Sequence, residues 1–341
     1  MSTMQPPQVR AMRDTLLLSL YQAMLQDDDI FFVTADFGSP VLDKIRADCP
    51  KRFINVGIAE QNLINVSAGL ALEGFKVFAY AIAPFITMRC YEQIRVNLAL
   101  LSKVRSINVN LIGVGAGYSY VVSGPTHQCY EDLTVIRALP NMRIFSPADQ
   151  VVAASLPAKC LASNGPKYLR LDAQVLPVLY GAAAPDFDLG FYEHKQGEKV
   201  CLLATGYMVH TALKVADKLA ASGVSVGVID LFDLCSFSED QLQSMLASYQ
   251  GVVTMEEGFR GRGGMDAMMF DYIARRGMDI RMLNIGVEGE YHFELGERNV
   301  LHEKVGIGVA AVTEKVGRFM RALPELKSDL LMSTKKLTVK L

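Results

Sequence analysis

Two kinds of hydrophobic pattern alternate along the chain. Residues 9–26 repeat apolar side chains at helical spacing, and the next apolar run, 30–34, is short and rich in β-branched and aromatic residues. Similar short apolar runs follow, with helical patterns between several of them, at 75–80, 109–114, 142–145 and 166–171. Strands that alternate with helices predict a parallel sheet with helices on both faces.

A second alternation begins near residue 199. It predicts strands at 199–204, 224–230, 251–255 and 280–285, and helices at 209–221 and 265–276. Residues 182–198, rich in Gly, Ala, Pro and Asp, predict a linker, and the Lys-containing residues 324–341 predict a surface tail. We therefore expect an α/β protein with two doubly wound domains, at 1–181 and 199–323.

Three loops are the expected positions of a binding site. In parallel sheets, ligands bind at the loops that follow the carboxyl ends of the strands. The relevant loops are those after Val33, Tyr80 and Val114, and the last of them, 115–128, is rich in Gly and Tyr.

Composition and charge narrow the class of protein. Half of the residues are hydrophobic, and 34 basic and 36 acidic residues are well mixed, so no basic face for nucleic acid is indicated. No apolar run reaches membrane-spanning length, and residues 1–10 lack the apolar core of a signal peptide. The six cysteines form neither a CxxC motif nor a Cys/His cluster, so neither a zinc site nor a disulfide framework is indicated, and we expect a cytoplasmic protein with reduced thiols.

Glu60 is the single acidic residue in the otherwise apolar, small or amide-bearing stretch 53–72. Asn55 and Gly57 can form the turn before a helix, which places Glu60 in the first helical turn, where free backbone N–H groups favour a carboxylate. The residues that follow are apolar on most sides, so the helix is expected to be buried. An enclosed carboxyl group suits proton exchange, and helix capping is the alternative interpretation.

Four short motifs follow one another along the chain, at Val56–Asn62, Gly124–Gln128, Ala138–Met142 and Pro147–Asp149. In this order they resemble the C-terminal half of transketolases, and more narrowly the separately encoded C-terminal subunit of split transketolases. The resemblance extends from about residue 10 to about residue 322. It implies a pyrimidine-binding domain, a smaller C-terminal α/β domain, and thiamine diphosphate with Mg²⁺ bound between subunits.

The resemblance also implies functional residues. Glu60 matches the family's Glu, which hydrogen-bonds the aminopyrimidine ring of the cofactor and helps its thiazolium carbon to lose a proton. His127 matches a loop His that contacts a substrate oxygen and assists proton transfer. Other positions are expected beside the cofactor (Asp36, Phe85 and Arg89) or beside the substrate (Ser39, Ser123 and Arg170). The alternatives are a core phenylalanine, a solvated histidine, structural ion pairs for the arginines, and helix caps at 36 and 39.

Two positions depart from the family pattern. Ser123 stands where transketolases usually have an Asp that contacts a substrate hydroxyl. Gly115, twelve residues before His127, stands where relatives carry a His for the sugar phosphate. We therefore expect an acceptor other than the usual short phosphosugars, and Tyr118 and Tyr120 could pack against it.

The chain contains no Gly-Asp-Gly followed by Asn, the motif that holds Mg²⁺ and diphosphate in this family. We therefore expect activity only with an N-terminal subunit that supplies this motif, in a symmetric heterotetramer that acts on a ketose and an aldehyde. Three alternatives remain open at this point. They are a 2-oxo acid dehydrogenase β subunit, a half-enzyme like 1-deoxy-D-xylulose-5-phosphate synthase, and a non-catalytic relative.

Overall fold

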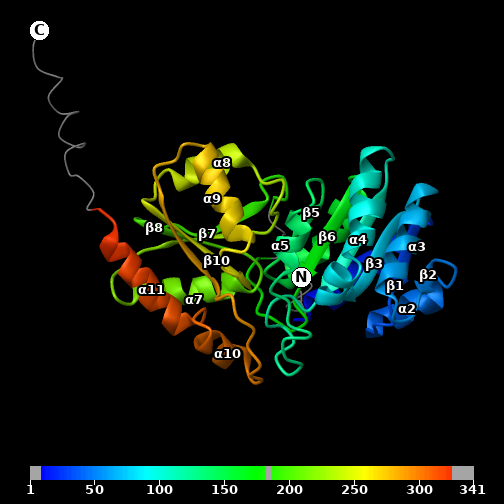
Figure 1. The fold of residues 1–341 in the computed structure, drawn as a ribbon, viewed down its shortest axis with the longest axis horizontal. Coiled ribbons are helices and arrows are strands. Elements are labelled where there is room, and N and C mark those ends of the chain that lie inside the picture. The colour runs from blue at the N-terminus through cyan, green and yellow to red at the C-terminus, as the bar shows by residue number, and fades with distance from the viewer. Residues whose placement is uncertain (1–8, 182–185, 325–341) are drawn as a thin grey trace, which may run out of the picture.

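The computed structural model describes residues 9–181 and 186–324 and shows two α/β domains (Figure 1). The predicted tail, from residue 325 onwards, lies outside the described residues. The first domain has one parallel sheet of six strands in the order β2-β1-β3-β4-β6-β5. Its strands are β1 (Ile30–Thr34), β2 (Phe53–Asn55), β3 (Lys76–Ile82), β4 (Asn108–Val114), β5 (Arg143–Phe145) and β6 (Gly165–Leu171).

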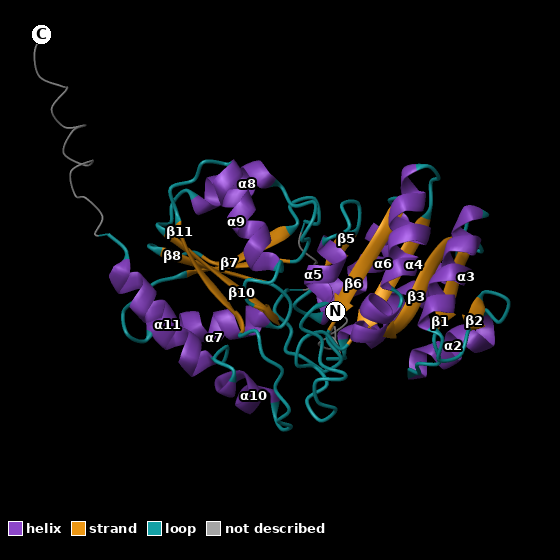
Figure 2. Ribbon diagram, in the orientation of Figure 1, coloured by secondary structure: helices purple, strands orange, loops and turns teal. Residues whose placement is uncertain are grey.

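Helices cover both faces of the first sheet, as predicted (Figure 2). One face carries α1 (Met12–Met24), α2 (Pro40–Asp48) and α6 (Gln150–Leu161). The other carries α3 (Glu60–Leu72), the helical segments η1 (Phe85–Arg89), α4 (Tyr91–Ile94), η2 (Arg95–Leu100) and η3 (Leu101–Lys103), and α5 (Asp132–Arg137). Alternate residues of each strand point to opposite faces of the sheet. In β3, Phe78 and Tyr80 pack on the α1 side, and Val77 and Ala79 pack on the α3 side.

The sheet has a switch point beside β1, which lies between β2 and β3. The chain leaves β1 through α2 over one face and leaves β2 through α3 over the other. In open α/β sheets, a crevice for ligands forms at such a point, outside the carboxyl ends of the strands. The loop after β1 and the start of α3 both lie at this edge.

The second domain has a five-stranded sheet in the order β11-β10-β8-β9-β7. The strands are β7 (Phe191–Lys195), β8 (Val200–Ala204), β9 (Gly227–Leu231), β10 (Gly251–Phe259) and β11 (Arg281–Val287). One face carries α7 (Met208–Ala220), α10 (Arg298–Lys304) and α11 (Val309–Ala322), and the other carries α8 (Glu239–Leu246) and α9 (Met265–Arg275). This sheet is mixed, because β7 runs antiparallel to β9.

Strand β7 lies inside the range predicted as a linker, so that prediction is wrong for residues 191–195. The two domains also share buried contacts. One apolar cluster continues from the first sheet through Met142 to Leu234 and α9, and the backbone N–H of Ser146 donates to the carbonyl of Phe232. The predicted α/β fold with two sheets is confirmed, and the junction between them is a packed interface.

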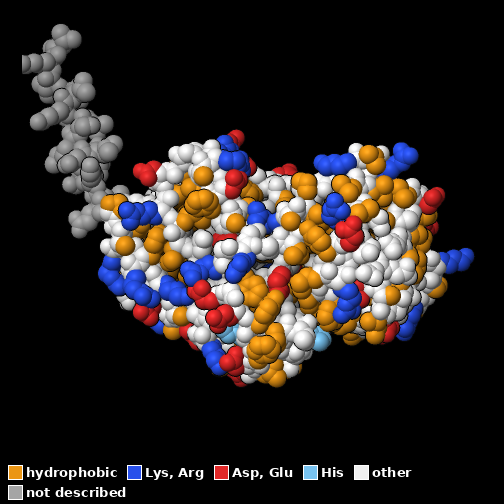
Figure 3. Space-filling view, in the orientation of Figure 1, with side chains coloured by type: hydrophobic (Ala, Val, Ile, Leu, Met, Phe, Trp, Pro, Cys, Tyr) orange, Lys and Arg blue, Asp and Glu red, His pale blue; other side chains and the backbone are white. Residues whose placement is uncertain are grey.

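The surface carries both signs of charge. Figure 3 shows Lys and Arg side chains interspersed with Asp and Glu over the visible face of both domains. All six cysteines are free thiols, and five of them are buried. In the described part of the chain, no helix combines the length and the apolar character needed to cross a membrane.

Candidate active site

Glu60 is the first residue of α3, and its side chain is 3% exposed. Both carboxylate oxygens accept hydrogen bonds from Nη1 of Arg89, each at 2.8 Å. Within the described residues, this arginine is the hydrogen-bond partner of the carboxylate, and no backbone N–H of the helix takes that place. The Arg89 side chain is 46% exposed, so the ion pair lies at the boundary between the buried helix and solvent.

Phe85 and Arg89 lie on one turn of a π-helix, η1. The guanidinium carbon of Arg89 lies 4.3 Å from the centre of the Phe85 ring, which is a cation–π contact. The segment from Phe85 to Lys103 is divided into four short helical pieces. π-Helical turns occur frequently at functional sites, and this one holds Arg89 between the ring and Glu60.

His127 continues the row of side chains. Its ring packs edge-on against Phe85, with ring centroids 5.3 Å apart and an interplanar angle of 67°. The ring of Tyr120 is a second neighbour of His127, with ring centroids 6.3 Å apart and an interplanar angle of 82°. The structure thus brings Glu60, Arg89, Phe85 and His127 together, although they come from three different segments of the chain.

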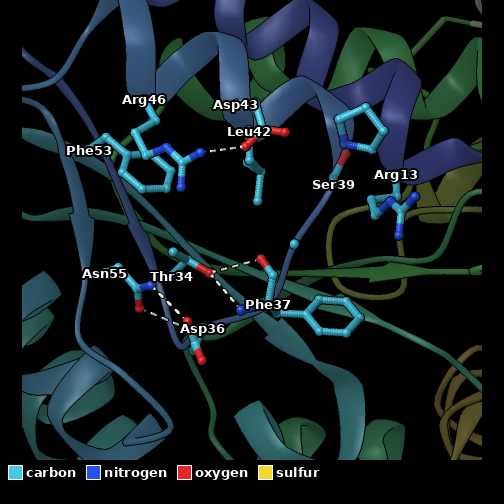
Figure 4. Close-up of a pocket in the computed structure, with 12 residues that line it drawn as sticks. Arg13, Thr34, Asp36, Phe37, Ser39, Leu42, Asp43, Arg46, Phe53 and Asn55 are labelled. Atoms are coloured by element: carbon cyan, nitrogen blue, oxygen red, sulfur yellow. Dashed lines mark hydrogen bonds and ion pairs between the residues drawn. The ribbon is translucent and has the colours of Figure 1, made fainter.

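A cavity of about 500 Å³ lies beside the loop that follows β1 (Figure 4). Asp36 and Ser39 line it, and Ser39 also caps α2 by accepting from the N–H of Val41 at 3.3 Å. Asp36 has φ +56°, a left-handed conformation that is costly for a residue other than glycine. Asn55 holds it there: Asp36 N donates to Asn55 Oδ1 at 3.1 Å, and Asn55 Nδ2 donates to Asp36 Oδ1 at 2.9 Å.

The charges around this cavity are balanced. Arg13 Nε lies 2.8 Å from Asp14 Oδ1, and Arg46 Nη2 lies 2.8 Å from Asp43 Oδ1. Asp36 adds a further negative charge to the lining. Both guanidinium groups are therefore already paired with carboxylates, so the cavity offers little net positive charge to a phosphate group.

Two of the expected substrate residues lie elsewhere. Arg170 is buried: its Nε donates to Asp132 Oδ2 at 2.7 Å and its Nη2 to the carbonyl of Glu257 at 3.1 Å. It thus makes the structural ion pair that was its alternative, and it does not line the cavity. Ser123 is exposed in the loop before His127. Tyr118 is 1% exposed and packs toward the second domain, away from the row of site residues.

A buried polar network at the domain junction was not predicted. Glu257 accepts from Arg298 Nε at 2.9 Å and Nη2 at 2.5 Å, and Arg298 Nη1 donates to Asp172 Oδ2 at 2.5 Å. Ser119 Oγ donates to Asp172 Oδ1 at 3.0 Å, which ties the loop that carries His127 to this network. Burial alone would raise the pKa of Glu257, but the guanidinium of Arg298 and the nearby imidazole of His302 hold it well below its usual value.

Comparison with known protein families agrees with this architecture. Residues 8–178 match the transketolase pyrimidine binding domain, and residues 192–312 match the transketolase C-terminal domain. The chain belongs to the transketolase family. The match to these two domains accounts for both sheets and includes every residue of the row described above.

Individual relatives place the chain within this family. One subunit of the apulose-4-phosphate transketolase of Phocaeicola vulgatus is 29% identical over 83% of this chain and 89% of that relative. 1-Deoxy-D-xylulose-5-phosphate synthase of Aquifex aeolicus is 30% identical over 78% of this chain, but the match spans only 41% of that longer protein. A solved split-gene transketolase, an inactive beta4 tetramer, superposes with a TM-score of 0.80 at 28% identity over 92% of this chain and 99% of that one.

A pyrimidine-binding transketolase domain implies thiamine diphosphate, and the site fits one half of that molecule. The buried carboxylate of Glu60 and the aromatic ring of Phe85 offer the hydrogen bond and the ring contact that a pyrimidine needs. In residues 9–181 and 186–324, no group of three or more His, Cys, Asp or Glu could hold a metal ion. The described residues therefore include groups that fit the pyrimidine half of the cofactor.

Proposed function

We propose that this chain is the C-terminal subunit of a split transketolase. The enzyme transfers a two-carbon ketol unit from a ketose to an aldehyde, and it requires an N-terminal subunit that holds the diphosphate and Mg²⁺. The observation that supports this proposal most directly is the contiguous row of Glu60, Arg89, Phe85 and His127. Bound thiamine diphosphate supplies the carbanion chemistry of the reaction.

Each residue of the row has a proposed role. Glu60 holds and exchanges a proton with the pyrimidine ring, and Phe85 packs against that ring. Arg89 keeps the Glu60 carboxylate in position, and its partial exposure allows it to move when the ring binds. His127 hydrogen-bonds a substrate oxygen and exchanges protons with it. Asp36 and Ser39 line the cavity that would receive the substrate.

Reconstitution tests the proposal. The purified chain with thiamine diphosphate and Mg²⁺ is expected to show no ketol transfer, because its sequence lacks the Gly-Asp-Gly motif followed by Asn that holds Mg²⁺ and diphosphate in this family. Activity should appear on mixing with a diphosphate-binding subunit encoded beside it, and light scattering should give the mass of a symmetric heterotetramer. The partner alone serves as the control. Robust turnover by the isolated chain would rule out the requirement for a diphosphate-binding subunit. An inactive complex would favour the non-catalytic alternative.

The similarity to 1-deoxy-D-xylulose-5-phosphate synthase supports a second candidate, a split enzyme with that activity. The same reconstituted complex distinguishes the two candidates. Pyruvate with glyceraldehyde 3-phosphate should give no product if the complex is a transketolase, whereas a ketose with an aldehyde should. Efficient release of CO₂ from pyruvate together with carbon–carbon bond formation would favour the second candidate.

The balanced charges of the cavity predict the acceptor class. Because Arg13 and Arg46 are each paired with an aspartate, a phosphate group would gain little there and would lose its hydration. We expect kcat/KM for D-ribose 5-phosphate to be lower, by about tenfold or more, than for the best uncharged aldehyde, a difference of about 1.4 kcal/mol. A panel of sugars with and without phosphate measures this ratio. A phosphorylated aldose as the best acceptor would contradict the prediction.

A further inference from the structure

Gly115 and Tyr120 occupy one shared space in the loop after β4. Gly115 has φ +102°, and a Cβ atom at this position would overlap Cε2 and Cδ2 of the Tyr120 ring. No side chain larger than hydrogen can therefore accompany the ring in its present position. The aromatic ring of Tyr120 thus occupies the space that a side chain at residue 115 would need.

The ring of Tyr120 stands next to His127, which also contacts Phe85. Along the row, Glu60 and Phe85 mark the cofactor end, His127 comes next, and Tyr120 follows. A substrate carbon that reacts near His127 would thus have its more distant atoms close to Tyr120. This position suits contact with the part of the acceptor that does not react.

One phenol hydroxyl group in this region has no hydrogen-bond partner among the described residues. The Oη atom of Tyr120 is buried and unpaired, whereas the hydroxyl group of the nearby Tyr80 interacts with Arg13. The Tyr80 ring packs on Phe37, which lines the cavity, with ring centroids 5.4 Å apart. Buried hydroxyl groups are normally satisfied, so the unpaired hydroxyl of Tyr120 points to a ligand that supplies the missing partner.

Arg13 interacts electrostatically with both phenols, but it brings little net charge. Its Nε is paired with Asp14, whose Oδ1 also accepts from Ser39 Oγ at 3.0 Å. Burial, which outweighs the opposing effect of Arg13, raises the pKa of Tyr120 to about 12. The phenol is therefore uncharged at neutral pH and acts as a hydrogen-bond donor.

We propose that Tyr120 determines acceptor specificity: its hydroxyl donates a hydrogen bond to a hydroxyl or carbonyl oxygen in the uncharged, non-reacting part of the aldehyde. The ring also fills the space above Gly115, so no cationic side chain can occupy it. This inference rests on the proposed ketol transfer and adds to it a substrate class, a polyhydroxylated aldehyde without phosphate at this position. Tyr120 is a binding residue in this scheme, while proton transfer stays with Glu60 and His127.

The variant Tyr120→Phe tests the inference in the assembled enzyme. It keeps the ring over Gly115 and removes only the hydroxyl. With hydroxypyruvate as the ketol donor, kcat/KM for D-erythrose is expected to fall by about three- to tenfold, the usual effect of losing one neutral hydrogen bond. For D-erythrose 4-phosphate, which differs only by the phosphate, kcat/KM should change by less than about twofold. The ratio of kcat/KM for D-erythrose to kcat/KM for D-erythrose 4-phosphate should therefore fall.

Tyr118→Phe is the matched control. It removes an equivalent buried hydroxyl from the same loop, but on the side that packs against the second domain. We expect it to leave the ratio between the two acceptors unchanged. Release of CO₂ from hydroxypyruvate without acceptor reports the donor half-reaction, and Tyr120→Phe should leave this rate unchanged too.

The outcomes separate this inference from the proposed function. Equal losses for both acceptors, or no loss for either, in an otherwise active complex would overturn the role of Tyr120 alone. A complex with no ketol transfer from any donor would overturn the proposed function itself. A loss confined to D-erythrose, with an intact donor half-reaction, supports both.

Discussion

Turnover of the assembled enzyme is expected to fall by about 10²–10⁴-fold when Glu60 is replaced by Gln, because general acid–base assistance typically contributes a factor of this size. The glutamine keeps the length of the side chain and one hydrogen-bond acceptor for Arg89 but cannot exchange a proton. Hydrogen–deuterium exchange at the thiazolium C2 of thiamine diphosphate should slow in parallel. NMR of the cofactor in the reconstituted complex measures this exchange without any substrate.

Folding and subunit association should survive this substitution. The Arg89 side chain is 46% exposed, so its charge remains hydrated when its partner is neutralised, and the loss of stability should stay within about 1 kcal/mol. Glu73→Gln is a matched control, because Glu73 is exposed at the other end of α3 and should leave both rates unchanged. C2 exchange at the native rate in assembled Glu60→Gln would remove the proton-transfer role and leave Glu60 as a structural residue.

The position of Glu60 could be predicted from sequence because its signals are local. A turn formed by Asn55 and Gly57, a single acid and an apolar run are enough to indicate the start of a buried helix, and the structure has α3 begin at Glu60. The three ligand loops followed from a general property of parallel sheets, whose strands all end at one edge. The row from Glu60 to His127 at that edge comes from two of these loops and α3.

Other elements depend on contacts distant in sequence. Helix α6 contains Pro157, and proline usually interrupts a helix, so the sequence pattern there is ambiguous. Strand β7 lies in a stretch rich in Gly, Pro and Asp, and it forms because it pairs with the edge of β9. Composition describes a segment alone, whereas its pairing partner determines whether it becomes a strand.

The partner of Arg170 also lies far from it in sequence. Arg170 alternates with apolar residues in a strand, and its burial beside Asp132 becomes visible only when the sheet and α5 are placed together. The sequence shows that Gly115 departs from the family pattern, but it does not show the physical consequence. Only the structure shows that Tyr120 fills the space that a side chain at this position would need.

The network at the domain junction gives the second large expected effect. Arg298→Met should lower the free energy of unfolding by about 3–5 kcal/mol, because it removes the guanidinium that pairs with two buried carboxylates, those of Glu257 and Asp172. The surface pair of Arg260 and Glu288 is the matched control. Both members of that pair are exposed, so Arg260→Met should cost at most about 1 kcal/mol.

Urea denaturation at several pH values measures this effect and its origin. Because Arg298 lowers the pKa of Glu257 in the folded chain, the stabilisation is complete above the unfolded value of about 4.3 and is lost as the pH falls toward the folded value. The difference between wild type and Arg298→Met should therefore narrow below about pH 4. A constant difference across this range would show that lost packing of Arg298 on Tyr207, and not its charge, causes the destabilisation.

The network also connects stability to the proposed site. Asp172 accepts from Ser119 in the loop that carries Tyr120 and His127, so loss of Arg298 should loosen that loop as well as the domain junction. The double variant Arg298→Met with Glu257→Gln removes one of the uncompensated charges, and we expect it to cost less than the sum of the two single variants. Strictly additive costs would mean that Arg298 and Glu257 do not act as a pair, and that the junction is held by its apolar contacts alone.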